Sequence, residues 1–454
     1  ELIMNNTNTT KAKVDMLNGP LFMKILIFAL PLAASSLLQQ LFNSVDVAVV
    51  GRFASSKALA AVGSNAPVIS LLINLFIGIS MGANVVISNH LGQRDEQSIR
   101  HAISTVTLVA AISGLLLMCI GIGVARPILE LMDTPSDVLD MAVLYLRIYF
   151  IGIPFFLIFN FGAAILRSVG DTRRPLYILV VAGIINTVLN LIFVIGLGMS
   201  VEGVAIATAV ANAISAAWII QLLRKEPGVI QLQFKHLRIY KKELKRMLQI
   251  GVPAGLQGMV FSISNVVVQS AINGYGAAAI AGSAAAVNFE YYCYYIIVAC
   301  NGAAISFIGQ NYGAQKYDRV RRIYRICLLM GLIGCFIANA LFTWQNQFFL
   351  SFFTTDAEVI HYGAIRMEGV LLFQFIACSY EVTGSALRGM GESMLPTIMT
   401  VFGTCILRII WVFAVLPHYT GFAHLLQVYP LSWILTGAMV IIAYKLKMRQ
   451  ICPK

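Results

Sequence analysis

The chain has 454 residues, of which 59% are hydrophobic and only 11% are charged, and its net charge at pH 7 is +12. Soluble domains carry about 25% charged residues, so this composition and the mean hydropathy of +0.81 exclude an ordinary soluble protein. The basic residues do not indicate nucleic-acid binding, because we find no soluble domain on which they could form a binding face.

The apolar sequence divides into twelve runs that are long enough to cross a bilayer as helices. About 20 residues at 1.5 Å per residue span roughly 30 Å of hydrocarbon. Strands of a membrane barrel would be about 10 residues long and would alternate in polarity, which these runs do not. We therefore predict an all-α membrane protein with spans at about 24–50, 60–89, 102–125, 140–166, 176–199, 203–223, 248–272, 279–309, 323–344, 361–386, 395–416 and 428–446.

The two halves of the chain are copies of one unit. The sequence LRSVGDTRRP begins at Leu166 and LRGMGESMLP begins at Leu387, a shift of 221 residues. A shift one residue longer places Pro31 on Pro253. Because each half has an even number of spans, the copies share one topology, and transporters with such parallel repeats bind their substrates between the repeats. We therefore expect the functional site in a cleft between two lobes.

This repeat defines the expected domains. We predict a cytoplasmic N-terminal tail, an N-lobe of spans 1 to 6, a cytoplasmic loop between the lobes, a C-lobe of spans 7 to 12 and a cytoplasmic C-terminal tail, at residues 1–23, 24–223, 224–246, 247–446 and 447–454.

The positions of Lys and Arg predict the orientation. Cytoplasmic loops hold an excess of both, and 26 of the 32 lie in the two tails, in the loops after spans 2, 4, 6, 8 and 10, or within three residues of the span ends that adjoin them. The polar N-terminal residues 1–19 show no cleavable signal. We therefore expect a monomeric, multi-pass protein of the inner cell membrane with both termini in the cytoplasm and with membrane lipids as neighbours.

Nothing in the sequence indicates an enzyme or a bound cofactor. Seven of the eight cysteines lie in apolar runs, without a CxxC pair or histidines at metal spacing, so we interpret them as buried hydrophobic side chains. No phosphate-binding loop is present, and the six histidines are scattered.

Span 1 carries the first candidate site residues. An ionisable group inside a span costs at least about 2.5 kcal/mol, so it faces an interior and is a functional candidate. Asp46 is such a group, and desolvation of its carboxylate favours proton uptake. Pro31 removes a backbone hydrogen bond and is a candidate hinge. Gln39 and Gln40 could line a cavity.

Amide oxygens in spans 4 and 5 would allow Asp46 to hold a metal ion instead. Asn186 and Asn190 share one face of span 5 at the i, i+4 spacing, and Asn160 lies in span 4. Na⁺ prefers oxygen ligands, as other hard cations do. We therefore predict a coupling site for H⁺ or Na⁺ at these residues, with Asp46, Asn186 and Asn190 as the sodium ligands.

The second half provides the predicted substrate contacts. Glu290 and Glu381 are acidic residues inside spans, and Glu381 falls on Asn160 under the shift of 221. Tyr294 belongs to a cluster that could contribute cation–π contacts or form an aromatic belt at the membrane interface, and its other members are Tyr291, Tyr292 and Tyr295. Arg408 is counted among the predicted substrate-binding residues, and we expect it to pair with one of the two glutamates. Arg366 is interpreted as a residue of the outer rim.

The sequence resembles the multidrug and toxic compound extrusion (MATE) transporters over nearly its whole length. The resemblance rests on four segments: LPLAASSLLQQLFNSVDVAVVGRF in span 1, ALAAVG at 58–63, FIGQNYGA at 307–314, and ALRGMGES at 386–393 with its weaker copy ILRSVGDT at 165–172. It implies a twelve-helix, two-lobe antiporter that expels organic cations in exchange for Na⁺ or H⁺.

The resemblance also bears on individual residues. Asp46 matches the family's carboxylate in span 1, and Asn186 matches an asparagine near it. Many relatives carry a second aspartate where this chain has Asn190. In the family, bending of the first helix is linked to ion binding, which supports Pro31 as a hinge.

Two other functions remain alternatives at this point. A flippase for lipid-linked oligosaccharides or another lipid would need several arginines to bind a pyrophosphate, whereas the spans offer Asp46, Glu290 and Glu381 against Arg408. A channel or a non-transporting receptor would give ion currents or signalling without gradient-driven uptake of small cations. The scarcity of buried cations favours export of cationic small molecules.

Overall fold

The computed structural model describes residues 13–419 and 421–452, and every regular element within them is a helix. Residues 1–12 of the predicted N-terminal tail and residues 453–454 of the predicted C-terminal tail lie outside the described residues. Twelve helical stretches are long and apolar enough to cross a membrane. The predicted all-α membrane architecture is therefore confirmed.

The first six spans comprise the elements α1 (Leu21–Val49) with η2 (Val50–Ala54), α2 (Ser56–Gln93), α3 (Glu96–Leu131), α4 (Ser136–Ser168), α5 (Arg173–Leu191) with η3 (Ile192–Gly196), and α6 (Val201–Lys225). A short turn, η4 (Phe234–His236), follows in the loop between the halves.

The second half contains α7 (Lys241–Asn273), α8 (Ala277–Gly313), α9 (Tyr317–Trp344), α10 (Asn346–Ser351), α11 (Ala357–Gly369), η5 (Leu371–Ala377), α12 (Cys378–Gly389), α13 (Met394–Thr400), η6 (Val401–Ile406), α14 (Leu407–Ile410), η7 (Trp411–Val415), η8 (Leu416–His418), α15 (Phe422–Leu426) and α16 (Val428–Ile451). Span 10 therefore consists of α11, η5 and α12, and span 11 runs from α13 to η8.

The described residues form two compact units. Unit 1 contains residues 13–15 and 34–248, and unit 2 contains residues 16–33 and 249–452. Helix α1 passes from unit 2 to unit 1 after Ala33, two residues beyond Pro31, and α7 passes from unit 1 to unit 2 after Leu248. The first helix of each half thus contributes to both units.

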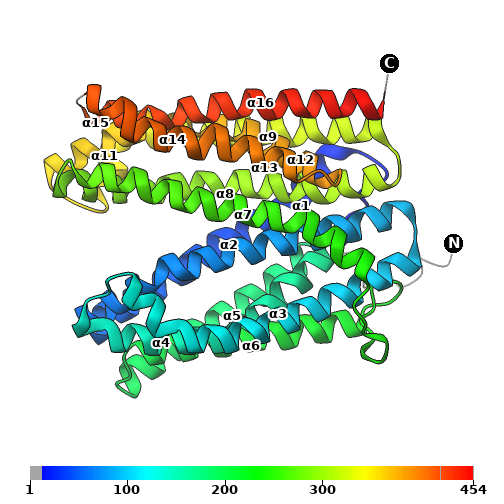
Figure 1. Cartoon of the computed structure of the whole chain (residues 1–454), viewed down its shortest axis with the longest axis horizontal. Helices are drawn as coiled ribbons and strands as arrows, with labels where there is room; N and C mark the ends of the chain where they lie inside the picture. Colours follow the sequence, from blue (N-terminus) through cyan, green and yellow to red (C-terminus); the bar gives the residue numbers. More distant parts are fainter. Residues whose placement is uncertain (1–12, 420, 453–454) are drawn as a thin grey trace. The chain divides into compact units, whose positions relative to one another are not determined.

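In unit 1, α4 is the central helix, and it packs against α2, α3 and α6 while α5 packs against α6. These helices run alongside one another in Figure 1. The side chains of Ala142 and Leu146 on α4 are fully buried. Glycines allow the close approach, because helices in a membrane associate mainly through small residues and tight packing.

In unit 2, α8 packs against α9, α11 and α12, and α12 packs against α16. The two copies of the repeat differ in their fourth span. Pro154 lies within α4, and the shift of 221 places it on Phe375, in the 3₁₀ segment η5 that separates α11 from α12. Both copies therefore interrupt regular backbone bonding at corresponding places, one by a proline and one by a tighter helix.

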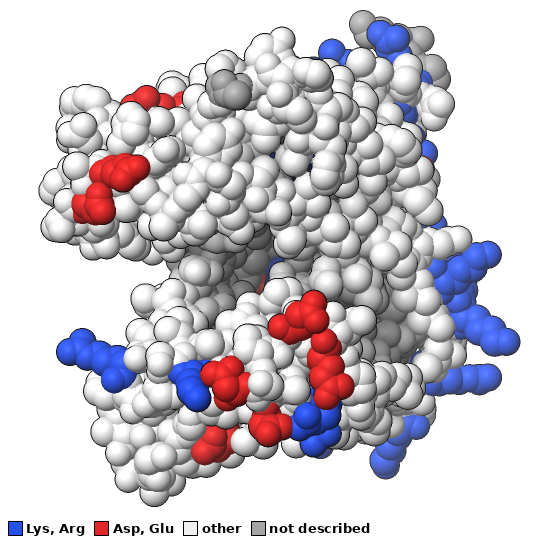
Figure 2. Space-filling model, turned by 60° about the vertical axis from the view of Figure 1, so that its left-hand side comes forward, with Lys and Arg blue, Asp and Glu red and all other residues white. Residues whose placement is uncertain are grey.

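The outward surfaces of the helices are apolar. Leu115, Leu116 and Ile120 of α3 expose more than half of their surface. Figure 2 shows a visible face that is mostly uncharged, with Lys and Arg along its right-hand side and a group of acidic and basic residues in its lower part. A helix that is apolar on all sides is typical of a membrane span, so these surfaces suit contact with lipid.

Replacement of Gly114 tests the packing of α3 on α4. A Cβ atom at Gly114 would lie 2.6 Å from the backbone Cα of Pro154, whereas one at Gly123 of the same helix would meet nothing within 4 Å. We expect Gly114→Val to lower the free energy of unfolding by about 1–3 kcal/mol and Gly123→Val to change it by less than about 0.5 kcal/mol. Thermal unfolding of both variants in detergent measures this, and equal midpoints would contradict the packing.

Candidate functional site

Asp46 lies half-buried in α1 and contacts polar side chains of two other helices of unit 1. The Asn190 amide on α5 donates to Asp46 Oδ1 at 2.5 Å, and the Thr208 hydroxyl on α6 donates to Asp46 Oδ2 at 3.4 Å. Asn190 and Asn186 are themselves buried. The structure therefore brings together the carboxylate and the two asparagines that the sequence predicted.

The four polar side chains form a closed hydrogen-bonded ring. Asn190 Nδ2 also donates to Asn186 Oδ1 at 3.2 Å, and Asn186 Nδ2 donates to Thr208 Oγ1 at 3.2 Å. Sequence reasoning missed Thr208. Its only signal was one hydroxyl in the alanine-rich run VAIATAVA, and such residues often serve simple helix packing in membranes.

The charge on the Asp46 carboxylate is not balanced by a basic side chain. Among the described residues, no salt bridge involves Asp46, and only desolvation and two neutral hydrogen-bond donors act on it. Asp171, Glu226 and Glu290 each form an ion pair with an arginine, in the pairs Asp171–Arg174, Glu226–Arg174 and Glu290–Arg366, and Glu243 contacts the His90 imidazole. A carboxylate in an apolar span without a cation is costly, so this ring suits uptake of a cation from solution.

The donor set of the ring fits a small hard cation as well as a proton. Asn190 Oδ1 is buried and has no hydrogen-bond donor. An unsatisfied oxygen of this kind beside a carboxylate is a suitable ligand for Na⁺, which prefers oxygen. The two carboxylate oxygens, the amide oxygens and the Thr208 hydroxyl together could complete such a site, or a proton could reside on Asp46.

Local backbone structure positions the ring. Helix α1 changes to the π-helical segment η2 four residues after Asp46, and α5 changes to η3 two residues after Asn190. π-Helical turns occur frequently at functional sites. One turn before Asp46, the ring of Phe42 packs so closely on Gly183 of α5 that a Cβ there would lie 1.8 Å from it. This glycine therefore allows α1 to approach α5.

The other predicted residues of the first half lie outside the ring. Asn160 donates to the carbonyl of Phe156 in its own helix at 2.9 Å, and no hydrogen bond in the described chain joins it to Asp46. Gln39 is exposed on α1 and Gln40 is half-buried. Pro31 lies inside the continuous helix α1. Roles of these residues in ion binding, cavity lining and bending stay predictions.

Glu381 lies in a buried polar cluster of unit 2. Asn301 Nδ2 of α8 donates to Glu381 Oε2 at 3.0 Å, and the Tyr294 hydroxyl lies 3.4 Å from Glu381 Oε1. Arg388 of the same helix interacts electrostatically with Glu381 and donates to Gln257 Oε1 of α7 at 2.6 Å. The structure therefore joins the predicted residues Glu381 and Tyr294, but Arg388 partly balances the carboxylate.

The four tyrosine side chains beside Glu290 point in different directions from helix α8. Tyr291 and Tyr292 expose 48% and 43% of their surface, whereas Tyr294 and Tyr295 are half-buried. Because neighbouring residues of a helix point in different directions, only part of the cluster can contact any one ligand. Of the four, Tyr294 is the tyrosine that reaches Glu381.

The interpretation of Arg366 as a rim residue is wrong. Arg366 is buried, and its Nε and Nη2 donate to the two carboxylate oxygens of Glu290 at 2.6 and 3.0 Å. A bidentate arginine–carboxylate pair is strong and geometrically specific. The Glu290 carboxylate is therefore already neutralised, which argues against the predicted contact with a cationic substrate. Sequence spacing could not reveal this pair, because 76 residues separate its partners.

The predicted ion pair of Arg408 with Glu290 or Glu381 is also wrong within the described residues. Arg408 Nη1 donates to Asn265 Oδ1 at 2.8 Å, and its guanidinium lies 4.5 Å from the ring centre of Tyr429 and 4.9 Å from that of Phe261. Cation–π contacts of this kind offset part of the cost of burying the charge. Arg408 is therefore fixed in the core of unit 2.

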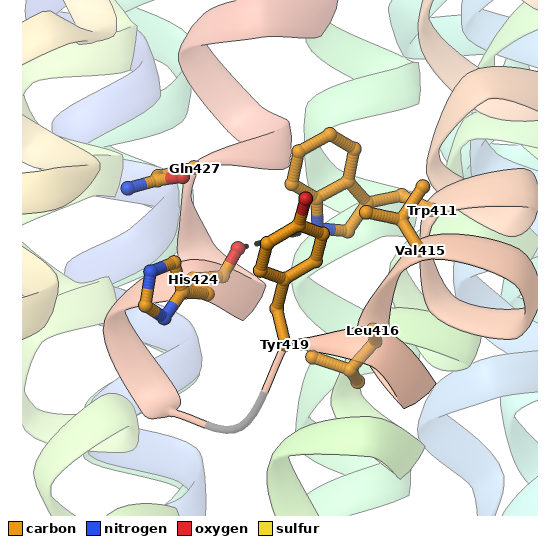
Figure 3. Close-up of a pocket in the computed structure, with 6 residues that line it drawn as sticks. All are labelled: Trp411, Val415, Leu416, Tyr419, His424 and Gln427. Carbon is orange, nitrogen blue, oxygen red and sulfur yellow. Dashed lines mark hydrogen bonds between the residues drawn. The ribbon is translucent and has the colours of Figure 1, made fainter.

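A pocket at the α15 end of unit 2 contains none of the predicted site residues. Its volume is about 290 Å³, and it is lined by Trp411, Val415, Leu416, Tyr419, His424 and Gln427. Figure 3 shows the rings of Trp411, Tyr419 and His424 around it, and Trp411 Nε1 donates to the His424 carbonyl at 3.2 Å. No acidic side chain lines it, and amphipathic rings near helix ends are typical of the membrane interface.

Comparison with known proteins agrees with this arrangement. A model of the MatE family matches residues 31–192 and 253–413, two stretches that begin at the repeated prolines Pro31 and Pro253. The chain belongs to the MATE family. Members of this family are transporters, which confirms that the protein is a transporter and not an enzyme.

Several relatives of this MATE transporter are known. It is 28% identical over 403 residues to the probable multidrug resistance protein YoeA of Bacillus subtilis, covering 87% of this chain and 86% of YoeA. It is 23% identical to the multidrug export protein MepA of Staphylococcus aureus, covering 89% of each. An outward-facing structure of a multidrug resistance MATE family transporter shares the fold, with a TM-score of 0.89, 21% identity, and 97% and 98% of the two chains covered.

The pair Glu290–Arg366 provides a test of charge balance in unit 2. Removal of one partner from a buried ion pair typically costs about 3–5 kcal/mol, because the other charge stays buried. We expect Arg366→Met to destabilise the protein by about this amount, and Glu290→Gln with Arg366→Met to recover part of the loss. Thermal unfolding in detergent measures both, and a double variant at least as unstable as Arg366→Met would contradict this account.

Proposed function

We propose that this MATE transporter is a secondary antiporter that expels lipophilic organic cations in exchange for H⁺ or Na⁺ bound at Asp46. One observation supports it most: the Asp46 carboxylate has hydrogen bonds from neutral groups and no basic partner in the described chain. A charge in this setting is stabilised by a proton or a sodium ion, and both can arrive from either side of a membrane under a gradient.

Coupling requires the ion and the substrate to prefer different conformations, because a ligand with equal affinity for two conformations does not shift the equilibrium between them. Helix α1 carries Asp46, and just beyond Pro31 the helix leaves unit 2 and enters unit 1. A proline permits a change of helix direction. We therefore propose that ion binding at Asp46 alters the bend of α1 at Pro31 and so resets the transporter.

The substrate class rests on the relatives and on the second half of the chain. YoeA and MepA are described as multidrug resistance and export proteins. We propose that Glu381 and Tyr294 contact a cationic substrate, which would draw the carboxylate away from Arg388. Gln39 and Gln40 would add polar contacts. The distribution of Lys and Arg supports placement in the inner membrane with cytoplasmic termini, and we propose that the monomer transports.

Asp46→Asn tests the coupling site directly. We expect it to reduce gradient-driven ethidium transport to background, because an amide can neither hold a proton as a carboxyl does nor neutralise Na⁺. The matched control is Asp133→Asn, in the exposed turn after α3, with transport equal to wild type. Normal transport by Asp46→Asn at equal expression would disprove coupling at this residue.

Thr208→Val tests the hydrogen-bonded ring while the carboxylate is kept. A hydrogen bond to a charged group contributes about 1.5–3 kcal/mol, so we expect the concentration of the coupling ion at half-maximal transport to change by about tenfold or more. Proteoliposomes under a pH gradient alone and then a Na⁺ gradient alone show which ion drives transport. An unchanged ion dependence in Thr208→Val would exclude the hydroxyl from the ion site.

A further inference from the structure

A second pocket lies in unit 1, at the beginning of α3, and the proposed transport cycle does not use it. Its volume is about 320 Å³. Residues of the first turns of α3 and of the loop between α6 and α7 line it with polar groups, among them Gln97, Arg100, His101, Gln231, Gln233 and His236. No acidic residue lines it. Apart from the apolar residues Ile103, Leu232 and Leu237, the lining therefore offers groups that can donate hydrogen bonds to an anion.

The loop is fixed on α3, so the pocket is already formed. Ser104 Oγ donates to the carbonyl of Arg238 at 2.7 Å and accepts from the Arg238 amide at 2.6 Å. The Tyr240 amide donates to Thr105 Oγ1 at 3.0 Å, and the rings of His101 and Tyr240 stack 3.7 Å apart. A ligand would therefore meet a prearranged wall.

The charge of this loop is positive and uncompensated on its surface. Its only acids, Glu226 and Glu243, are buried. Glu243 accepts from or pairs with His90 at 2.8 Å. Burial raises the pKa of Glu226, but the bonds from Arg174 and Lys13 outweigh it and hold the pKa below its usual value. The exposed charges that remain come from Arg224, Lys225, Lys235, Arg238, Lys241, Lys242, Lys245 and Arg246.

Arg100 is the cation best placed to bind a ligand in the pocket. It is exposed, and no hydrogen bond or ion pair involves its side chain within residues 13–419 and 421–452. The nearest acids along α3 are Asp95 and Glu96. Asp95 caps the helix by accepting from the Ser98 amide at 3.0 Å. Neither acid lines the pocket, so neither occupies the site that Arg100 faces.

The level of the pocket along α3 suggests the source of the anion. Helix α3 has 36 residues and is about 54 Å long, well beyond the roughly 30 Å of hydrocarbon in a bilayer. Gln97, Arg100 and His101 lie in its first turns, before the most apolar part of the span. Side chains at this level meet lipid headgroups, which carry phosphate in the membrane itself.

We propose that this pocket binds the phosphate of an anionic phospholipid. Arg100 would contact the phosphate oxygens through two N–H groups, a geometry for which guanidinium is suited. The imidazoles and glutamine amides would provide further N–H donors. Basic pockets at the ends of membrane helices bind anionic headgroups in this way. The site would anchor the loop between the lobes to the membrane surface.

Lipid binding by native mass spectrometry of the purified protein tests the proposal without any transport assay. We expect phosphatidylglycerol to bind more tightly than phosphatidylcholine. Arg100→Gln should weaken phosphatidylglycerol binding more than about tenfold, the loss of a charged hydrogen bond. Lys225→Gln also removes one positive charge, from the loop that forms the other wall but outside the pocket lining, and should cost no more than about fivefold.

Lys57→Gln is the remote control, since Lys57 lies at the start of α2, about 54 Å along the helix from Gln93, which precedes the turn into α3, and binding should be unchanged. An unaltered thermal midpoint of Arg100→Gln shows that it folds. Equal losses of phosphatidylglycerol affinity in Arg100→Gln and Lys225→Gln would overturn the proposed site and indicate diffuse electrostatic attraction instead. Equal binding of the two wild-type lipids would also overturn it. Displacement of the lipid by equimolar glycerol 3-phosphate would assign the pocket to soluble phosphate instead.

Discussion

A single carboxylate in an apolar span, without a basic partner, is the constraint on which the proposed function depends. Asp46 accepts hydrogen bonds from the Asn190 amide and the Thr208 hydroxyl, which hold its orientation but cannot cancel its charge, and Asn186 joins these two donors. In water an unpaired carboxylate would cost little, whereas in a membrane the free-energy cost of its charge favours the binding of a cation. In the proposed antiport, these four side chains would form the site at which the coupling ion binds.

The duplicated architecture explains why such a site can be coupled to a change of conformation. Each half supplies six spans, yet α1 and α7 are each divided between the two compact units. Asp46 lies on the part of α1 that belongs to unit 1, beyond Pro31. A helix that is packed into two bodies cannot bend without affecting both, because packed interiors transmit strain.

The acidic side chains of the protein differ in which groups balance their charge, and the proposed function uses those that lack a full ion pair. Glu290 is fixed by Arg366, and Glu226 and Glu243 are fixed by basic partners near the helix ends. These pairs leave the loop between the lobes with a basic surface, suited to the phosphate of a lipid headgroup. Glu381 is intermediate, since Arg388 acts on it from the same helix.

Composition, the length of the apolar runs and the repeat at 221 residues determined the membrane class, the twelve spans and the two similar halves, because these depend on local composition and on chain order. The family was indicated by the resemblance of four segments. The sequence also identified Asp46 and its two asparagines, since an acid within an apolar run and an i, i+4 pair can be recognised from residue order alone. Only the tertiary structure decided the partners. Thr208, Arg366 and Asn265 come from helices distant in sequence, and which side chains meet across helices depends on the rotation and depth of each helix in its bundle, which no local pattern encodes.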